Sequence, residues 1–238
     1  MNILIIGGTR FVGRAIAESA LNRGHNVTLF HRGKTGGELF TQAEHIFGDR
    51  EHDLALLEGR SWDIVIDTCA YTPRITRLAA EALSNAAPRY LFISTISVYA
   101  NFNGRITEES PLATLADPTV EEINGETYGG LKVLCESVVS EIYGSRATIL
   151  RPGLIAGPHD PTDRFTYWVD RIARGGETLA PRISERPIEF IDARDLADFT
   201  VTACEDNVTG VYNAVGFDPP LSIENFLTAC CAELSGHC

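Results

Sequence analysis

An apolar run broken by glycines near the start of the chain constrains its fold most strongly. Residues 3–6 predict a buried strand, which Gly7 and Gly8 end in a tight turn. Residues 11–21 then resume with the apolar spacing of a helix, and Gly13 removes a side chain where helix and strand pack closely. Such a unit is typical of dinucleotide-binding folds, in which the helix N-terminus receives a pyrophosphate. A tight turn without a ligand is the simpler alternative.

Basic residues follow the next predicted strand, where the adenosine ribose of a dinucleotide is normally met. Residues 26–30 form this strand, and His31, Arg32 and Lys34 lie at its tip. An acidic residue there would hydrogen-bond the free ribose hydroxyls of NAD, whereas basic side chains suit the extra phosphate of NADP. We therefore expect NADP as the cofactor, with NAD as the alternative. The competing interpretation is that Arg32 and Lys34 are ordinary solvated loop charges.

Strands and helices alternate along the rest of the chain, as in a doubly wound parallel sheet. A third predicted strand runs into Asp49 and Arg50, where an adenine ring would be met. Residues 63–70 and 89–95 predict two more strands, with a helix between them that begins after Pro73 and runs to Leu83. The strands end in small or hydroxylated residues, at the edge where open α/β folds bind ligands. The expected fold class is α/β, a Rossmann-type doubly wound parallel sheet with a small C-terminal substrate-binding part.

Length and charge limit the classes of function. The chain has 238 residues and a formal net charge of −12, which argues against a nucleic-acid surface because phosphate backbones are held by clustered Lys and Arg. No apolar run approaches the ~20 residues that span a bilayer, and the N-terminus enters a strand rather than a signal peptide. We expect a cytoplasmic protein that binds a small-molecule substrate, and neither nucleic acid nor a membrane.

The cysteines and histidines indicate no metal site. The six cysteines show no metal-ligand spacing, and several lie in apolar stretches, so we expect free thiols. His159 is the one histidine near the expected pocket, and a lone loop histidine is more often solvated than a ligand.

Tyr128 and Lys132, four positions apart, carry the catalytic signal. On a helix this spacing puts the phenol and the ammonium on one face. A free tyrosine has a pKa near ~10, and a neighbouring cation favours the phenolate and lowers that value. Tyr128 would then exchange a proton with a substrate alcohol or carbonyl, with Thr95 or Ser97 hydrogen-bonded to the same oxygen. The alternative is an ordinary helix, because Tyr and Lys fall at this spacing on many helices.

Five motifs follow one another along nearly the whole chain: GGTRFVG, ISTISVYA, YGGLK, RPGLIAGPHD and IEFIDARDLADF. In these motifs the chain resembles the extended and atypical short-chain dehydrogenases/reductases, including the NAD(P)-dependent epimerase/dehydratase group. The resemblance implies a Rossmann fold, Tyr128 as the acid/base, Lys132 as a holder of the nicotinamide ribose and Thr95 as the hydroxyl that polarises the substrate. It places the loop of residues 151–153 beside the nicotinamide. Relatives often dimerise through the helix with the Tyr/Lys pair, so a homodimer is also implied.

Two features depart from the family's pattern. Arg10 stands where the family has the middle glycine of its first loop, and its side chain either turns toward the cofactor phosphates or points to solvent. The chain also stops soon after a predicted helix over 222–234, where relatives carry further residues. We expect an NAD(P)-binding Rossmann domain over residues 1–150 and a shortened substrate-binding subdomain over 151–238, interleaved with the Rossmann core. The residues expected at the cofactor are Gly7, Thr9, Arg10, Phe11, Val12, His31, Arg32, Asp49, Arg50, Ala70, Tyr71, Lys132, Pro152 and Gly153.

Residues 163–177 have apolar side chains at helical spacing, which first predicts core packing. These side chains are Phe165, Trp168, Val169 and Ile172. As an alternative role for this stretch, Arg164, Tyr167 and Arg171 face the pocket and hold an anionic or sugar-like substrate.

Three hypotheses for function follow. The first is an NADP(H)-dependent oxidoreductase acting on a carbonyl or alcohol of a small metabolite or sugar-like substrate. The second is a nucleotide-sugar epimerase or dehydratase that holds its dinucleotide tightly and reoxidises it within one cycle. The third is a non-catalytic NAD(P)-sensing or RNA-associated binding protein. Replacing Tyr128 by Phe separates them, because an enzyme loses turnover and keeps cofactor affinity.

Overall fold

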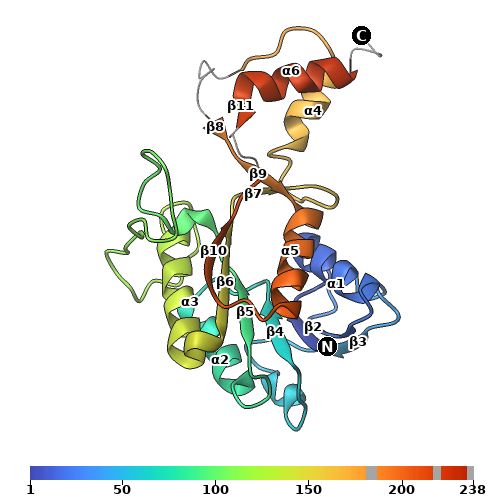
Figure 1. The fold of residues 1–238 in the computed structure, drawn as a ribbon, viewed down its shortest axis with the longest axis vertical. Coiled ribbons are helices and arrows are strands. Elements are labelled where there is room, and N and C mark those ends of the chain that lie inside the picture. The colour runs from blue at the N-terminus through green and yellow to red at the C-terminus, as the bar shows by residue number, and fades with distance from the viewer. Residues whose placement is uncertain (181–186, 217–220, 235–238) are drawn as a thin grey trace.

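The computed structural model describes residues 1–180, 187–216 and 221–234, and its centre is a seven-stranded parallel sheet (Figure 1). The predicted doubly wound α/β fold is confirmed. The strand order is typical of Rossmann folds, with one strand added beyond the sixth position. From one edge to the other, the sheet runs β10 (Gly210–Ala214), β6 (Ala147–Pro152), β5 (Tyr90–Ile93), β4 (Ile64–Asp67), β1 (Asn2–Ile6), β2 (Asn26–His31) and β3 (Glu44–Phe47).

Helices cover both faces of this sheet. Helices α1 (Phe11–Asn22) and α5 (Ala193–Glu205) lie on one face, and α2 (Pro73–Leu83) and α3 (Tyr128–Tyr143) on the other (Figure 1). Alternate side chains of each strand pack against the helices on opposite faces of the sheet, because successive side chains along a strand point to opposite faces. In β1, Ile3 and Ile5 pack in the core beneath α1 and α5, whereas Leu4 and Ile6 pack in the core beneath α2 and α3. Short 3-10 helices lie at η1 (Leu54–Leu57), η2 (Ile96–Val98) and η3 (Gly144–Arg146).

A smaller unit stands beyond the carboxyl ends of the strands (Figure 1). The ring of Phe165 lies 4.8 Å from that of Phe190 and 5.1 Å from that of Phe226, measured between centroids. Phe165, Trp168, Val169 and Ile172 are half-buried, so the predicted core packing is only partial. The unit contains α4 (Thr166–Ala173), α6 (Ile223–Leu234) and the strand pairs β7 (Leu154–Ala156) with β9 (Phe190–Asp192) and β8 (Pro187–Ile188) with β11 (Leu221–Ser222).

Two predicted strands are shorter in the structure. The pairing of β1 with β4 ends at Ile6 and Asp67, because Gly7 turns the chain away and leaves the next residues without a partner strand. The predicted strand over 63–70 therefore spans Ile64–Asp67, and that over 89–95 spans Tyr90–Ile93.

The structure also bears on cysteines, metals and membranes. The described cysteines Cys69, Cys135, Cys204, Cys230 and Cys231 are free thiols, and Cys238 lies outside the described residues. Within the described ranges, no group of three His, Cys, Asp or Glu side chains is arranged to hold a metal ion. None of the described helices is long and apolar enough to cross a membrane.

Candidate active site

The turn between β1 and α1 forms a cradle that only glycines allow. Gly7 and Gly8 have φ angles of 104° and 89°, in the region that L side chains rarely adopt. A Cβ on Gly7 would lie 2.4 Å from the Thr68 hydroxyl, and one on Gly13 would lie 2.8 Å from the backbone nitrogen of Gly8. The bare backbone and the amides at the start of α1 fit a pyrophosphate, as predicted from the glycine spacing.

A cavity of about 980 Å³ opens beside this cradle, and it is large enough for a dinucleotide. Ten of the residues expected at the cofactor line it: Gly7, Thr9, Arg10, Phe11, Val12, His31, Arg32, Asp49, Arg50 and Tyr71. Ala70, Lys132, Pro152 and Gly153 lie off this lining. The Gly153 amide donates to the Ala214 carbonyl at 3.1 Å, so β10 already uses it.

The tip of β2 presents basic side chains to the cavity. Arg32 and Lys34 are exposed and lie on its lining. Among the described residues that line it, the acidic ones are Asp49 and Glu51. Asp49 accepts a hydrogen bond from the Glu51 amide at 3.0 Å, and the Glu51 carboxylate pairs with Arg74 at 2.7 Å. The cavity therefore offers cations at the position where NAD-binding folds usually offer a carboxylate.

The His31 ring is engaged within the protein. Its Nε2 lies 2.9 Å from Nδ1 of His45, and its Nδ1 accepts from the Gly33 amide at 3.1 Å. Burial, and next the neighbouring His45, lower the pKa of His31, which favours the neutral ring. His31 therefore shapes the wall of the cavity, and its contact with a cofactor stays a prediction.

Arg50 is part of a buried network that sequence reasoning missed. Its guanidinium donates to both Asp67 oxygens at 2.7 Å, and Tyr90 donates to the same carboxylate at 2.6 Å. Burial works to raise the Asp67 pKa, but the charge and hydrogen bonds of Arg50 hold it below its ordinary value. The sequence did contain a signal for this network: Asp67 ends a buried strand, and a buried carboxylate needs a hydrogen-bonding or charged partner. Arg50 still lines the cavity, and its cofactor contact stays a prediction.

Lys132 is buried beneath the carboxyl edge of the sheet. Its ammonium donates to the carbonyls of Ile93 at 2.8 Å and Ala70 at 3.0 Å, and it lies 4.2 Å from the centroid of the Phe92 ring. Burial lowers the pKa of Lys132 to about 8. The predicted helix thus places a cation near the ends of β4 and β5, with the Ala70 and Ile93 carbonyls as its acceptors.

Tyr128 begins α3 beside Thr95, and its pKa differs from the prediction. Burial raises the pKa of Tyr128 more than a hydrogen bond with Thr95 and the charge of Arg164 lower it. The sequence predicts a lowered value because of Lys132, and this is wrong for the protein alone, since the ammonium is directed at the Ala70 and Ile93 carbonyls. Tyr128 is therefore a protonated phenol at neutral pH.

Comparisons with known proteins identify the family of the chain. The model of the "NAD dependent epimerase/dehydratase family" matches residues 3–215. The Arabidopsis thaliana "Chloroplast stem-loop binding protein of 41 kDa b" is 30% identical over 211 residues, 82% of this chain and 53% of that protein. The chain thus spans about half the length of this curated relative.

Two solved structures share the fold. A putative epimerase from Burkholderia cenocepacia J2315 has a TM-score of 0.79 and 20% identity, covering 98% of this chain and 81% of that one. The UDP-glucuronic acid 4-epimerase from Bacillus cereus, solved with NAD, has a TM-score of 0.75 and 20% identity. The match covers 99% of this chain and 84% of that one. The predicted resemblance is confirmed, and the chain belongs to the NAD dependent epimerase/dehydratase family.

Proposed function

We propose that the chain is an NADP(H)-dependent oxidoreductase that acts on a carbonyl or alcohol of a small, sugar-like metabolite. Two observations support the proposal: Tyr128 begins α3 beside Thr95, and Lys132, one turn further along α3, lies at the Ile93 and Ala70 carbonyls near the carboxyl edge of the sheet. This edge is where open α/β folds bind their ligands. The smaller unit, with Arg164 near Tyr128, would supply the substrate side of the pocket.

The residues suggest a division of roles. The Gly7–Gly13 turn would hold the pyrophosphate, and Lys132 would hold the nicotinamide ribose. The bound nicotinamide would supply hydride chemistry. Tyr128 Oη would give a proton to the substrate oxygen, and Thr95 Oγ1 would hydrogen-bond to that same oxygen. Because burial raises the pKa of Tyr128, its phenol keeps its proton at neutral pH, which suits reduction of a carbonyl.

The proposed preference for NADP rests on Arg32 and Lys34 at the tip of β2. A charge-assisted hydrogen bond from Arg32 to a phosphate would contribute about 1.5–3 kcal/mol, which is about tenfold to a hundredfold in affinity. We would titrate dinucleotide-free protein with NADPH and NADH, and repeat both titrations with Arg32→Ala. Arg105→Ala is the matched control, because Arg105 is exposed and lies off the cavity lining.

We expect Arg32→Ala to weaken NADPH binding by that factor and to leave NADH binding nearly unchanged. Arg105→Ala should change neither affinity. Equal binding of both dinucleotides by the unaltered protein would overturn the NADP preference and leave NAD, the cofactor that the family's description names.

A second candidate is an epimerase or dehydratase in which the cofactor is reduced and reoxidised within one cycle. The family description and the sugar-nucleotide epimerases among the structural relatives favour it. An enzyme of this type keeps its dinucleotide through purification and turns over without added cofactor. A reductase consumes one NADPH per product, so absorbance of NADPH during turnover separates the two candidates.

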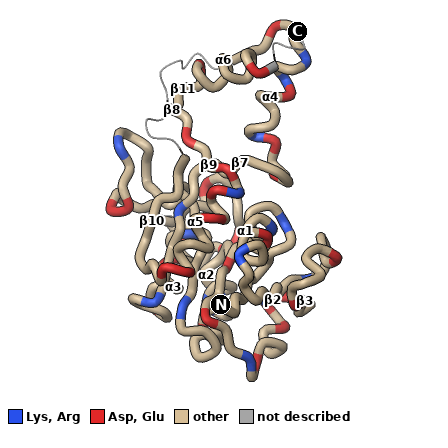
Figure 2. The backbone as a smooth tube through the Cα atoms, turned by 45° about the vertical axis from the view of Figure 1, so that its right-hand side comes forward, with Lys and Arg blue, Asp and Glu red and all other residues tan. Residues whose placement is uncertain are grey.

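A third candidate, RNA binding, rests on the printed name of the chloroplast relative. Against it stand the net charge of −12 and the Lys and Arg positions, which Figure 2 shows scattered among Asp and Glu along the described chain. We therefore expect no binding of a stem-loop RNA at physiological salt in a gel-shift assay.

Tyr128→Phe should abolish turnover and keep NADPH affinity, and a variant with unchanged turnover would refute the catalytic role of Tyr128.

A further inference from the structure

Three consecutive residues at the end of β5 contact three residues on one side of α3. The Ile93 carbonyl accepts from Lys132 at 2.8 Å, and the Ser94 hydroxyl donates to Glu136 Oε1 at 2.5 Å. Thr95 lies close enough to Tyr128 to affect the pKa of its phenol. The helix partners are spaced four residues apart, so three successive turns of α3 face the end of β5 from one side of the helix. Glu136 therefore anchors the same helix face that carries the proposed acid/base.

The second partner of Glu136 is Arg151 in β6. Arg151 donates to Glu136 Oε1 at 3.0 Å and to Oε2 at 2.6 Å, and the side chains are only 4% and 6% exposed. Its remaining nitrogen donates to the Tyr99 hydroxyl at 2.9 Å and to the Glu108 carbonyl at 3.0 Å. Arg151 stands directly before Pro152, where β6 ends. The pair thus joins α3 to both strand ends that flank the site.

Stability alone does not explain a buried pair of this kind. Removing two charges from water costs free energy, and the attraction between them offsets little more than that cost. A protein with a well-packed apolar pair at the same positions is therefore often as stable or more stable. What the pair provides is fixed geometry, because a bidentate contact allows one relative position of helix and strand. Tyr99 extends this constraint to β10 by donating to the Asn213 side chain at 2.6 Å.

We propose that Glu136 and Arg151 are positioning residues: they lock α3 against the ends of β5 and β6, so that Tyr128 and Thr95 reach one substrate oxygen and Lys132 reaches the cofactor. This inference rests on the proposed function. The inference adds that the position of α3 is fixed by Glu136, one turn after Lys132, and by its partner Arg151. In this proposal neither side chain contacts substrate or cofactor.

The test is a double variant, Glu136→Met with Arg151→Met. It removes one charge of each sign from the same buried pair. The charge of Glu136 itself raises the pKa of Lys132, so the charge-retaining Glu136→Asp variant below separates a displaced α3 from the loss of that charge. Lys34 and Lys132 are the only lysines in the sequence, so NMR of labelled lysine side chains follows Lys132 without needing turnover. The matched control is Glu141→Gln, because Glu141 lies on the same helix and pairs with Arg77 at the surface at 2.6 Å.

We expect the double variant to unfold at nearly the same denaturant concentration as the unaltered protein. Its Lys132 titration midpoint should move, and its turnover with NADPH should fall by about tenfold to a hundredfold through kcat, since small displacements of reacting groups carry such losses. The control should change neither quantity. A stable double variant with an unmoved Lys132 midpoint and full kcat would overturn the proposal.

A variant that keeps the charge covers the case in which the double variant does not fold. Glu136→Asp retains the carboxylate but shortens its reach to Ser94 and Arg151, so we expect the same changes in Lys132 midpoint and kcat, to a smaller degree. An Asp variant with both quantities unchanged would also overturn the proposal. If the unaltered protein shows no NADPH-dependent turnover, the proposed function fails, whereas the Lys132 midpoint still decides whether the pair positions α3.

Discussion

Raising the pH should remove the charge of Lys132 at a far lower pH than that of an ordinary lysine. Its side chain is 3% exposed, and burial lowers its pKa from an ordinary 10.5 to about 8. The shift of about 2.5 pH units corresponds to about 3 kcal/mol, at 1.36 kcal/mol per unit. This is the free energy by which the folded protein disfavours the charged form relative to the unfolded chain.

The sign of the effect on stability follows from proton counting. Below pH 8 the amine is charged in both states, so the folded protein carries the whole cost of burying it. Between pH 8 and 10.5 the unfolded chain binds more protons than the folded one, so this group makes the free energy of unfolding rise with pH. From pH 7 to pH 9.5 its contribution should rise by about 2 kcal/mol.

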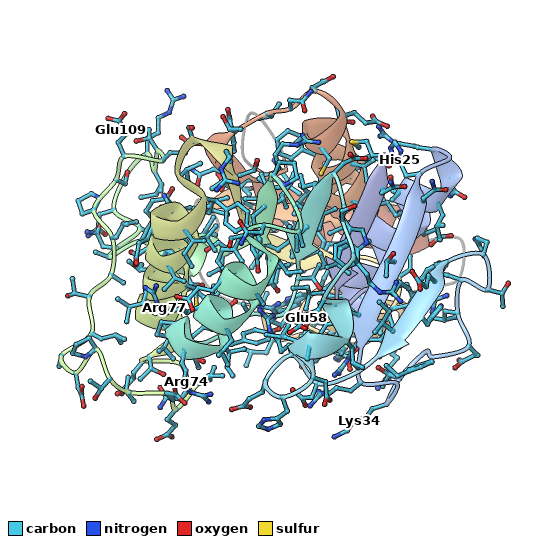
Figure 3. All side chains as sticks on the ribbon, turned by 90° about the horizontal axis from the view of Figure 1, so that it is seen from below. His25, Lys34, Glu58, Arg74, Arg77 and Glu109 are labelled. Atoms are coloured by element: carbon cyan, nitrogen blue, oxygen red, sulfur yellow. The ribbon has the colours of Figure 1, made fainter. Side chains whose placement is uncertain are left out.

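Two measurements check this expectation. NMR of labelled lysine side chains gives the Lys132 midpoint directly, with the exposed Lys34 at the surface as the reference (Figure 3). Urea unfolding at pH 7 and pH 9.5 gives the stability of the unaltered protein and of Lys132→Met. The difference between the two proteins should change by about 2 kcal/mol in favour of the unaltered one. A midpoint at or above 10, or a difference that is independent of pH, would refute the burial of a charged amine between the Ala70 and Ile93 carbonyls.

Other predictions concern packing and buried charge. Gly129→Ala should destabilise the protein by about 1–3 kcal/mol, because its Cβ would lie 2.1 Å from the Ser97 carbonyl oxygen, whereas Gly125→Ala, with nothing within 4 Å, should be nearly neutral. Equal urea midpoints for these two variants would contradict the close approach of α3 to η2. Asp67→Asn should cost about 3–5 kcal/mol, because it leaves the charge of Arg50 buried without its carboxylate. A loss below about 1 kcal/mol in the same assay would show that Arg50 finds water or another partner.

The sequence predicts the fold well because its signals are local. The glycine turn after β1 needs positive φ angles at Gly7 and Gly8, and the structure has them there. The helix expected after Pro73 and up to Leu83 is observed as α2 (Pro73–Leu83). It includes the proline itself, because Pro73 fits the first helical position. Such features depend on residues within a few positions of one another, and the sequence displays them directly.

Contacts between distant segments could not be predicted in the same way. Arg50 and Asp67 are 17 residues apart, and only the parallel pairing of strands brings them together. The acceptors of Lys132 are backbone carbonyls, which every residue has, so no side-chain pattern marks Ala70 or Ile93 in advance. The direction of the Tyr128 pKa depends on the same geometry, because burial and the orientation of the ammonium decide it.

The placement of the buried charges points to function rather than stability. Lys132, the Arg50–Asp67 pair and the Arg151–Glu136 pair all lie at or just beneath the carboxyl edge of the sheet, whereas the buried strand residues away from that edge are apolar or carry neutral hydroxyls such as those of Thr28 and Thr148. A buried cation costs free energy even when it is hydrogen-bonded, and a buried pair adds little beyond an apolar replacement. A chain selected for stability alone would spread apolar residues over this edge as well. The free-energy cost of burying charged side chains is concentrated where a ligand would meet the sheet. A preorganised site requires this, because its fixed charges and hydrogen-bond donors must be in place before the substrate arrives.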